Sequence, residues 1–351
     1  MRKRQLLCSL TACSILLLTQ VQATEFGIYG RAHLSIDQLD NGKDSGLNIS
    51  SNASRFGIRG SHQAQDNLKV LLQIESAIRL DEGSGDWASR NSFLGLQGDF
   101  GLVRAGFFDT PLKTVRSRTD LFGDQVGDAR NIVRGGGVDL DRRFRNGLHY
   151  QTPAMQNLTL DLHYSPNDRT GSTTDNKDDA FSSSVTFDNK ALMLMLAYER
   201  RNRLDNSALS GMRAGASYRL SEQWRLTAFW QHSENFTGGD RTAYGVGAAY
   251  RINDAYSVKG QLYHASSADT DDSGSTLLSL GVDRRFGRNL TLYAALAMTK
   301  TQQTASFNVS AGGGHGKSLA IEPGQDPFAL SLGVVYNFST TFGLCINHPT
   351  Q

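Results

Sequence analysis

The chain of 351 residues carries 36 Lys and Arg side chains against 34 Asp and Glu, a formal net charge of +2. It has no basic tract of the kind that binds nucleic acid, so we expect no nucleic-acid partner. Its 36 glycines and only 6 prolines favour many strands joined by short turns and give no sign of a disordered linker.

The N-terminus has the pattern of a secretory signal peptide. Positively charged residues 2–4 precede an apolar run over residues 6–18 and a small-residue cleavage motif that ends at Ala23. We therefore expect residues 1–23 to be a signal peptide. A lipoprotein-like acylation box ends at Cys13, but the apolar run continues past this cysteine, so we expect no lipid anchor there.

Beyond the signal, no apolar run reaches the roughly eighteen residues that a membrane helix needs. The remaining chain therefore either dissolves in the periplasm or crosses a membrane as strands. Of the three cysteines only Cys345 lies in this part, which excludes an intramolecular disulfide and a cysteine metal site.

Apolar and polar residues alternate along most of the chain. The clearest apolar faces consist of Leu68, Val70, Leu72 and Ile74; of Leu158, Leu160, Leu162 and Tyr164; of Leu278, Leu280 and Val282; and of Phe328, Leu330, Leu332, Val334, Tyr336 and Phe338. Strands of a soluble sandwich also alternate, but they run to about five or six residues. The segments seen here run nearer to about ten residues and carry aromatic residues at their ends. This pattern favours an all-β transmembrane antiparallel barrel, with the apolar face towards lipid and the polar face towards a water-filled interior.

The turns between these segments agree with a barrel. Short connections at residues 65–67, 98–101, 153–157, 188–189, 221–222, 253–254 and 287–289 alternate with longer polar ones at 40–52, 81–89, 114–142, 167–179, 202–211, 235–240, 265–275 and 302–325. They predict about sixteen strands in one domain, with short turns on one side and long loops on the other. We expect the barrel over residues 24–338 and a C-terminal extension of unknown role over 339–351.

The third long connection does not alternate. Residues 114–145 contain Asp120, Asp124 and Asp128 at a spacing of four, followed by several arginines and three consecutive glycines. A segment of about thirty residues without regular structure is uncommon in a compact domain and usually has a function. A solvated surface loop is the alternative.

Several segments near the N-terminus carry a family resemblance. Residues 24–31 (TEFGIYGR), 54–60 (SRFGIRG), 71–75 (LLQIE), 90–98 and 103–107 (VRAGF) resemble the opening strands of the trimeric general-diffusion porins of Gram-negative outer membranes. The resemblance implies a sixteen-stranded homotrimeric barrel among outer-membrane lipid and lipopolysaccharide, with the third loop folded into the lumen. The function it implies is a water-filled channel for passive diffusion of small hydrophilic solutes and ions.

The same resemblance assigns a constriction. In such porins, acidic groups on the inward loop face basic groups on the wall; the matching residues here are Asp120 and Asp124 on the loop, Arg31, Arg55 and Arg90 on the wall, and Arg134 just after the loop. Alternation alone directs Arg55 and Arg59 into the lumen, opposite Phe56 and Ile58. It also directs Lys69, Glu75 and Arg79 inward as pore-lining residues. Fixed charge and pore diameter set selectivity in such a channel.

The sequence leaves alternative functions open. A substrate-specific channel for an anion or a sugar is the main alternative. A barrel enzyme would need a nucleophile, a base and an orienting acid at one rim, and no motif singles these out, so we expect neither enzymatic activity nor a cofactor. Two acidic loop clusters, Asp269, Asp271 and Asp272, and Asp175, Asp178 and Asp179, suit either a divalent cation or plain solvent exposure; we expect no metal site.

Overall fold

The structure is a computed structural model that describes residues 22–171, 176–205, 207–312 and 314–346. Its strands are β1 (Gln22–Asp40), β2 (Ser45–Ser51), β3 (Arg55–Gln65), β4 (Leu68–Arg79), β5 (Ser84–Asp86), β6 (Ser92–Gly98), β7 (Gly101–Asp109), β8 (Arg143–Gln151), β9 (Leu158–Ser165), β10 (Ala180–Asp188), β11 (Leu192–Asn202), β12 (Ala208–Arg219), β13 (Trp224–Glu234), β14 (Arg241–Arg251), β15 (Tyr256–Ser267), β16 (Ser275–Phe286), β17 (Leu290–Thr301) and β18 (Phe328–Ile346). All of them belong to one antiparallel sheet.

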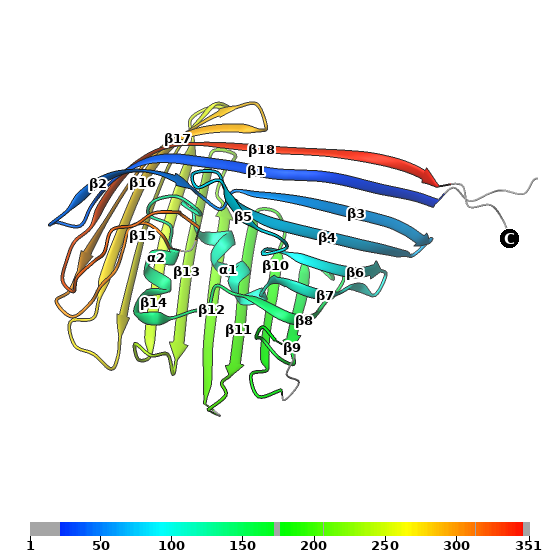
Figure 1. The fold of residues 1–351 in the computed structure, drawn as a ribbon, viewed down its shortest axis with the longest axis horizontal. Helices are drawn as coiled ribbons and strands as arrows, with labels where there is room; N and C mark the ends of the chain where they lie inside the picture. Colours follow the sequence, from blue (N-terminus) through cyan, green and yellow to red (C-terminus); the bar gives the residue numbers. More distant parts are fainter. Residues whose placement is uncertain (1–21, 172–175, 206, 313, 347–351) are drawn as a thin grey trace, which may run out of the picture.

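The sheet closes on itself because β1 pairs with β18 as well as with β2 and β3 (Figure 1). β2 and β3 pair with successive parts of β1, and β5 and β6 pair with successive parts of β4. We therefore count β2 with β3, and β5 with β6, as one interrupted barrel strand each. The predicted sixteen-stranded barrel is thereby confirmed. The expected signal peptide lies almost entirely outside the described residues, and its cleavage stays a prediction.

Exposed and buried side chains alternate along the strands, and the apolar side chains are the exposed ones, as in a membrane barrel. On β1, Asp37 is 0% exposed whereas its apolar neighbour Ile36 is 52% exposed. On β18, Ser331 is 0% exposed and Leu332 is 60% exposed. Apolar residues therefore form the outer face, which meets lipid, and polar residues form the wall of the lumen. Among the helices of the described residues, none is long and apolar enough to cross a membrane.

The last strand continues beyond the end that we expected. β18 runs past Phe338 to Ile346, and its residues from Ser339 onwards pair with Tyr29 back to Gln22 on β1. An unpaired strand edge leaves backbone polar groups without partners, so a continuing neighbour strand favours continued pairing. The boundary at Phe338 therefore does not coincide with the end of the barrel strand.

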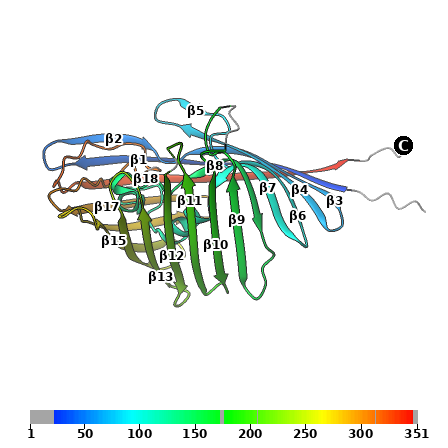
Figure 2. The same cartoon turned by 90° about the horizontal axis from the view of Figure 1, so that it is seen from below.

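The third loop folds into the lumen, as expected, and contains short helices (Figures 1 and 2). It comprises residues 110–142, with α1 (Pro111–Thr119), α2 (Arg130–Val133) and the 3-10 turn η1 (Gly135–Gly137). α1 begins where the Thr110 side chain accepts a hydrogen bond from the Lys113 amide and Pro111 occupies the first turn. The two helices lie against the inner wall, α1 along β10 to β13 and α2 along β14 to β16.

The apolar core lies between this loop and the wall. The loop contributes Leu112, Val115, Phe122, Val126 and Ile132, all 0% exposed. Facing strands contribute further buried residues, among them Phe229 and Tyr263. Burial of these side chains stabilises the inward position of a loop that would otherwise be solvated.

Candidate channel constriction

A buried ionic network holds the third loop against the wall. Arg116 of α1 lies 3.1 Å from Asp120 and 2.9 Å from Asp141, and Arg213 of β12 also contacts Asp141 at 2.5 Å. All four side chains are at most 4% exposed. Removing one partner of a buried pair leaves an uncompensated charge, so this network fixes where the loop lies.

Asp120 belongs to this network. Its carboxylate, 0% exposed, accepts hydrogen bonds from the amides of Phe122 and Ala129 and from the Gln261 side chain of β15. In the structure Asp120 therefore holds the loop, and its predicted role at the constriction stays a prediction. The reason is local: Asp120 follows the last residue of α1, where an acceptor is needed to satisfy amides of the next turn.

Asp124 does reach the wall. Its Oδ2 atom lies 3.1 Å from the Arg31 guanidinium of β1, and its Oδ1 atom accepts a hydrogen bond from Arg130 of α2 at 2.5 Å. Burial would raise the pKa of Asp124, but Arg130 and Arg31 outweigh it and hold the pKa below its ordinary value. The loop acid is therefore ionised and spans from the loop to the wall.

The wall cluster comprises Arg31, Arg55, Arg90 and Glu75. Arg31 and Arg55 are register partners on β1 and β3. Glu75 of β4 accepts a hydrogen bond from Arg90 Nε at 2.6 Å and lies 3.8 Å from Arg55 Nε. The structure thus brings together three of the four predicted basic residues with Asp124, and adds Glu75, which we had predicted only as pore-lining.

A tyrosine and a glycine position Glu75. Tyr29, Gly57 and Glu75 are successive partners across β1, β3 and β4, and the Tyr29 hydroxyl donates to Glu75 Oε2 at 3.0 Å. A Cβ atom at Gly57 would lie 2.3 Å from the Tyr29 ring. Glycine is therefore required at position 57 for the tyrosine to lie flat along the wall and reach the carboxylate.

The remaining predicted residues lie elsewhere. Arg134 pairs with Asp139 at 3.1 Å at the far end of the third loop, outside the wall cluster. Arg79 pairs with Asp86 at 3.5 Å, both more than half exposed. Arg59 is exposed beside the Tyr29 ring, and Lys69 is half-buried on β4 between Gln63 and Gln97.

Sequence reasoning missed two further ion pairs between neighbouring strands of the wall. Arg143 of β8 lies 3.1 Å from Asp109, and Lys259 of β15 lies 3.1 Å from Asp283 of β16. The only indication in the sequence was the alternation, which places these residues on the inner face of their strands. Within the described ranges no group of three or more His, Cys, Asp or Glu side chains is placed to hold a metal ion. Asp175 falls outside those ranges, and the expected absence of a metal site in the acidic loop clusters stays a prediction.

The eighth loop, residues 302–327, packs onto the third. The Val309 carbonyl accepts a hydrogen bond from the Gly127 amide at 2.7 Å. His315 Nε2 lies 2.8 Å from Asp37 on β1, with both side chains 0% exposed. The described residues of the eighth loop therefore contact both the third loop and the wall strand β1.

The chain is similar in sequence to known outer-membrane proteins. The family described as Gram-negative porin matches residues 9–304. Outer membrane porin protein 32 of Delftia acidovorans is 26% identical over 361 residues, which cover 96% of this chain and 100% of that protein. Major outer membrane protein P.IB of Neisseria gonorrhoeae is 26% identical over 176 residues, 47% of this chain, and the match spans about half (49%) of that relative.

Solved structures show the same fold. An anion-selective porin from Comamonas acidovorans superposes with a TM-score of 0.78 at 22% identity, covering 90% of this chain and 100% of that one. OmpT of Vibrio cholerae, in a trimer form, superposes with a TM-score of 0.66 at 16% identity, covering 90% of this chain and 99% of that one. With the family match over most of the sequence, the chain is a sixteen-stranded outer-membrane barrel and belongs to the Gram-negative porin family.

Proposed function

We propose that this porin is a passive diffusion channel for small hydrophilic solutes and ions that prefers anions. The observation that carries the preference is the wall cluster. Its three arginine side chains, Arg31, Arg55 and Arg90, are 18%, 26% and 18% exposed. The two acidic side chains that face them, Glu75 and Asp124, are 8% and 17% exposed, and Asp124 is shared with Arg130.

The charge presented to water at the gap is therefore positive on balance. A screening length of about 10 Å at 0.1 M salt lets this charge act across a narrow gap. Fixed charge in a narrow aqueous gap raises the local concentration of the opposite ion. The solved porin from Comamonas acidovorans that is described as anion-selective shares the fold and supports the same direction.

We further propose that the chain assembles as a homotrimer in contact with outer-membrane lipid and lipopolysaccharide. The trimer form of the similar OmpT barrel supports the assembly. The apolar outer face of β1, β2 and β18, with Ile36, Ile49 and Leu332 each more than half exposed, supplies surface for lipid or a neighbouring subunit. Because the family consists of channels, we propose no enzymatic activity.

Reconstitution of the folded protein into a planar bilayer tests the proposal. With a salt gradient across the membrane, the reversal potential should have the sign of an anion-preferring pore. A reversal potential of the cation-preferring sign would overturn the preference while leaving the channel itself intact.

A further inference from the structure

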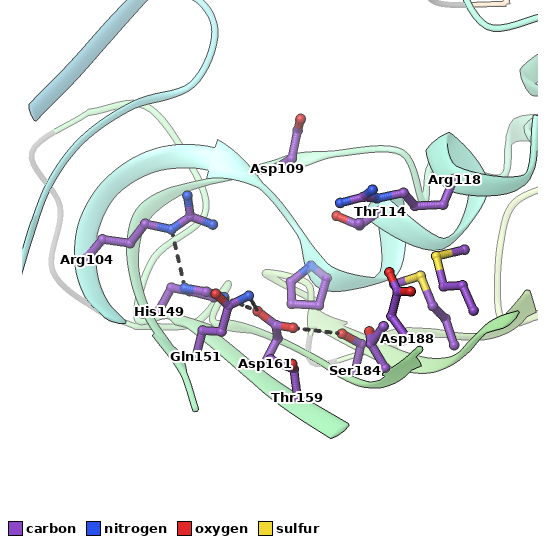
Figure 3. Close-up of a pocket in the computed structure, with 14 residues that line it drawn as sticks. Arg104, Asp109, Thr114, Arg118, His149, Gln151, Thr159, Asp161, Ser184 and Asp188 are labelled. Atoms are coloured by element: carbon purple, nitrogen blue, oxygen red, sulfur yellow. Dashed lines mark hydrogen bonds and ion pairs between the residues drawn. The ribbon is translucent and has the colours of Figure 1, made fainter. Parts of the chain in front are cut away.

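An alcove of about 360 Å³ lies beside the channel, between α1 and the inner wall of β7 to β11 (Figure 3). Asp188, the last residue of β10, places it on the side of the third loop that faces the short turns. Volumes of this order hold small-molecule ligands in other proteins. None of the wall-cluster residues lines it.

One end of the alcove presents a fixed cation. The Arg104 guanidinium of β7 stacks over the rings of Phe93 and Phe108, with 4.9 Å and 4.2 Å to their centroids. Its Nε atom donates to His149 Nδ1 at 3.3 Å. No carboxylate of the described residues forms an ion pair with it, so its terminal amino groups, which point into the alcove in Figure 3, are open to an anionic ligand.

The floor presents a fixed anion. Asp161 of β9 accepts hydrogen bonds at Oδ1 from His149 Nε2 (3.0 Å) and from Gln151 (2.9 Å). Its Oδ2 atom has a single long contact with Ser184 Oγ at 3.4 Å. Oδ1 of Asp161 thus has two hydrogen-bond donors within the protein, whereas Oδ2 can still accept a hydrogen bond from a ligand. His149 bridges Arg104 and Asp161 and holds both side chains in place.

The alcove is lined by a second cation and a second available anion. Arg118 of α1 is exposed and forms no ion pair within the described part of the chain, and Asp188 is the second available acid. Asp109 also lines the alcove but is neutralised by Lys113 at 2.6 Å and Arg143 at 3.1 Å. Two cations and two anions therefore remain for a ligand.

We infer that the alcove is a binding site for a small zwitterionic solute, an amino acid or a short peptide, whose carboxylate meets Arg104 and Arg118 and whose ammonium meets Asp161 and Asp188. A simple anion would leave both acids unpaired, which is unfavourable in a partly desolvated site. A sugar would gain from aromatic surface, and among the described lining residues there is no Phe, Tyr or Trp. The inference rests on the proposed diffusion function, because solutes reach the alcove through the lumen.

Current noise in a planar bilayer tests the inference with three probes of nearly equal size. Dialanine carries both charges, N-acetyl-dialanine only the carboxylate and dialanine amide only the ammonium. On the parent channel, dialanine should add saturable current noise at lower concentration than either blocked form. Open-channel current without peptide reports the diffusion function separately, so failure of the site and failure of the channel are distinguishable.

Substitutions then assign the charges. Arg104→Gln and Asp161→Asn should each weaken the dialanine response roughly tenfold or more, as expected when a hydrogen bond to a charged group is lost. Arg285→Gln in β16 and Glu222→Gln in the turn between β12 and β13 are the controls. They make the same charge changes outside the alcove and should retain the parent's dialanine affinity. If Arg104→Gln does not fold, the exposed Arg118→Gln replaces it, with the same expected direction. Equal responses to the three probes, or parental affinity in both the arginine variant and Asp161→Asn, would overturn the inference.

Discussion

Arg31 on the first strand and Asp124 on the third loop lie 3.1 Å apart, across 93 positions of sequence. This pair joins the loop to the wall. Because Asp124 is also held by Arg130, its charge is fixed in place. The first two predictions concern the two sides of this contact.

Replacing Asp124 with asparagine should shift the reversal potential further towards anions, since the loop side loses its negative charge while the wall arginines remain. The shift should be largest at low salt and shrink as salt rises. Asp86→Asn, which removes the same charge from an outer-loop pair whose aspartate is 59% exposed, is the control and should give a much smaller shift. A parental reversal potential for Asp124→Asn would place this residue outside the ion path.

Replacing both Arg55 and Arg90 with glutamine should shift the reversal potential towards cations. Glu75, which now faces these two arginines, would then act on the gap with less compensation. Arg288→Gln, in the short turn between β16 and β17, changes charge away from the wall cluster and serves as the control. If the double variant keeps the parent's anion preference at low salt, the wall cluster does not set selectivity.

Gly57→Ala should destabilise the barrel by about 1–3 kcal/mol, because the added methyl group meets the Tyr29 ring and forces it from Glu75. Gly60→Ala on the same strand is a matched control, since the nearest atom to its Cβ would be 3.9 Å away. The readout is the temperature at which folded protein disappears from a semi-native gel. Equal temperatures for the two variants would contradict the proposed packing of Tyr29.

Asp141→Asn should loosen the third loop, because Arg116 and Arg213 then share an interior site without their carboxylate. Breaking a buried pair of this kind costs about 3–5 kcal/mol. We expect larger and noisier single-channel currents together with a lower unfolding temperature. Asp139→Asn removes partly exposed pairs with Arg134 and Arg142, in which Asp139 is 36% exposed, and should change both measurements little.

The barrel could be predicted from sequence because alternation is a local property: the parity of Arg55 relative to Phe56 fixes which one faces water. The loop could not be oriented in this way. The spacing of four between Asp120 and Asp124 says nothing about direction in irregular backbone, and the Gln261 partner of Asp120 is 141 positions away. The end of the last strand was missed for a related reason, since its partner is the start of β1, at the other end of the chain.

The packing of the eighth loop limits how freely the outer surface can vary. Surface loops ordinarily tolerate substitution and insertion. Here a side chain at Gly314 would collide with the Arg130 guanidinium and the Asp124 carboxylate, and one at Gly312 would meet Asn131. A substitution in the eighth loop therefore disturbs the contact between Arg130 and Asp124 in the third loop. We expect this stretch to vary less in sequence than the exposed loops of surface proteins ordinarily do.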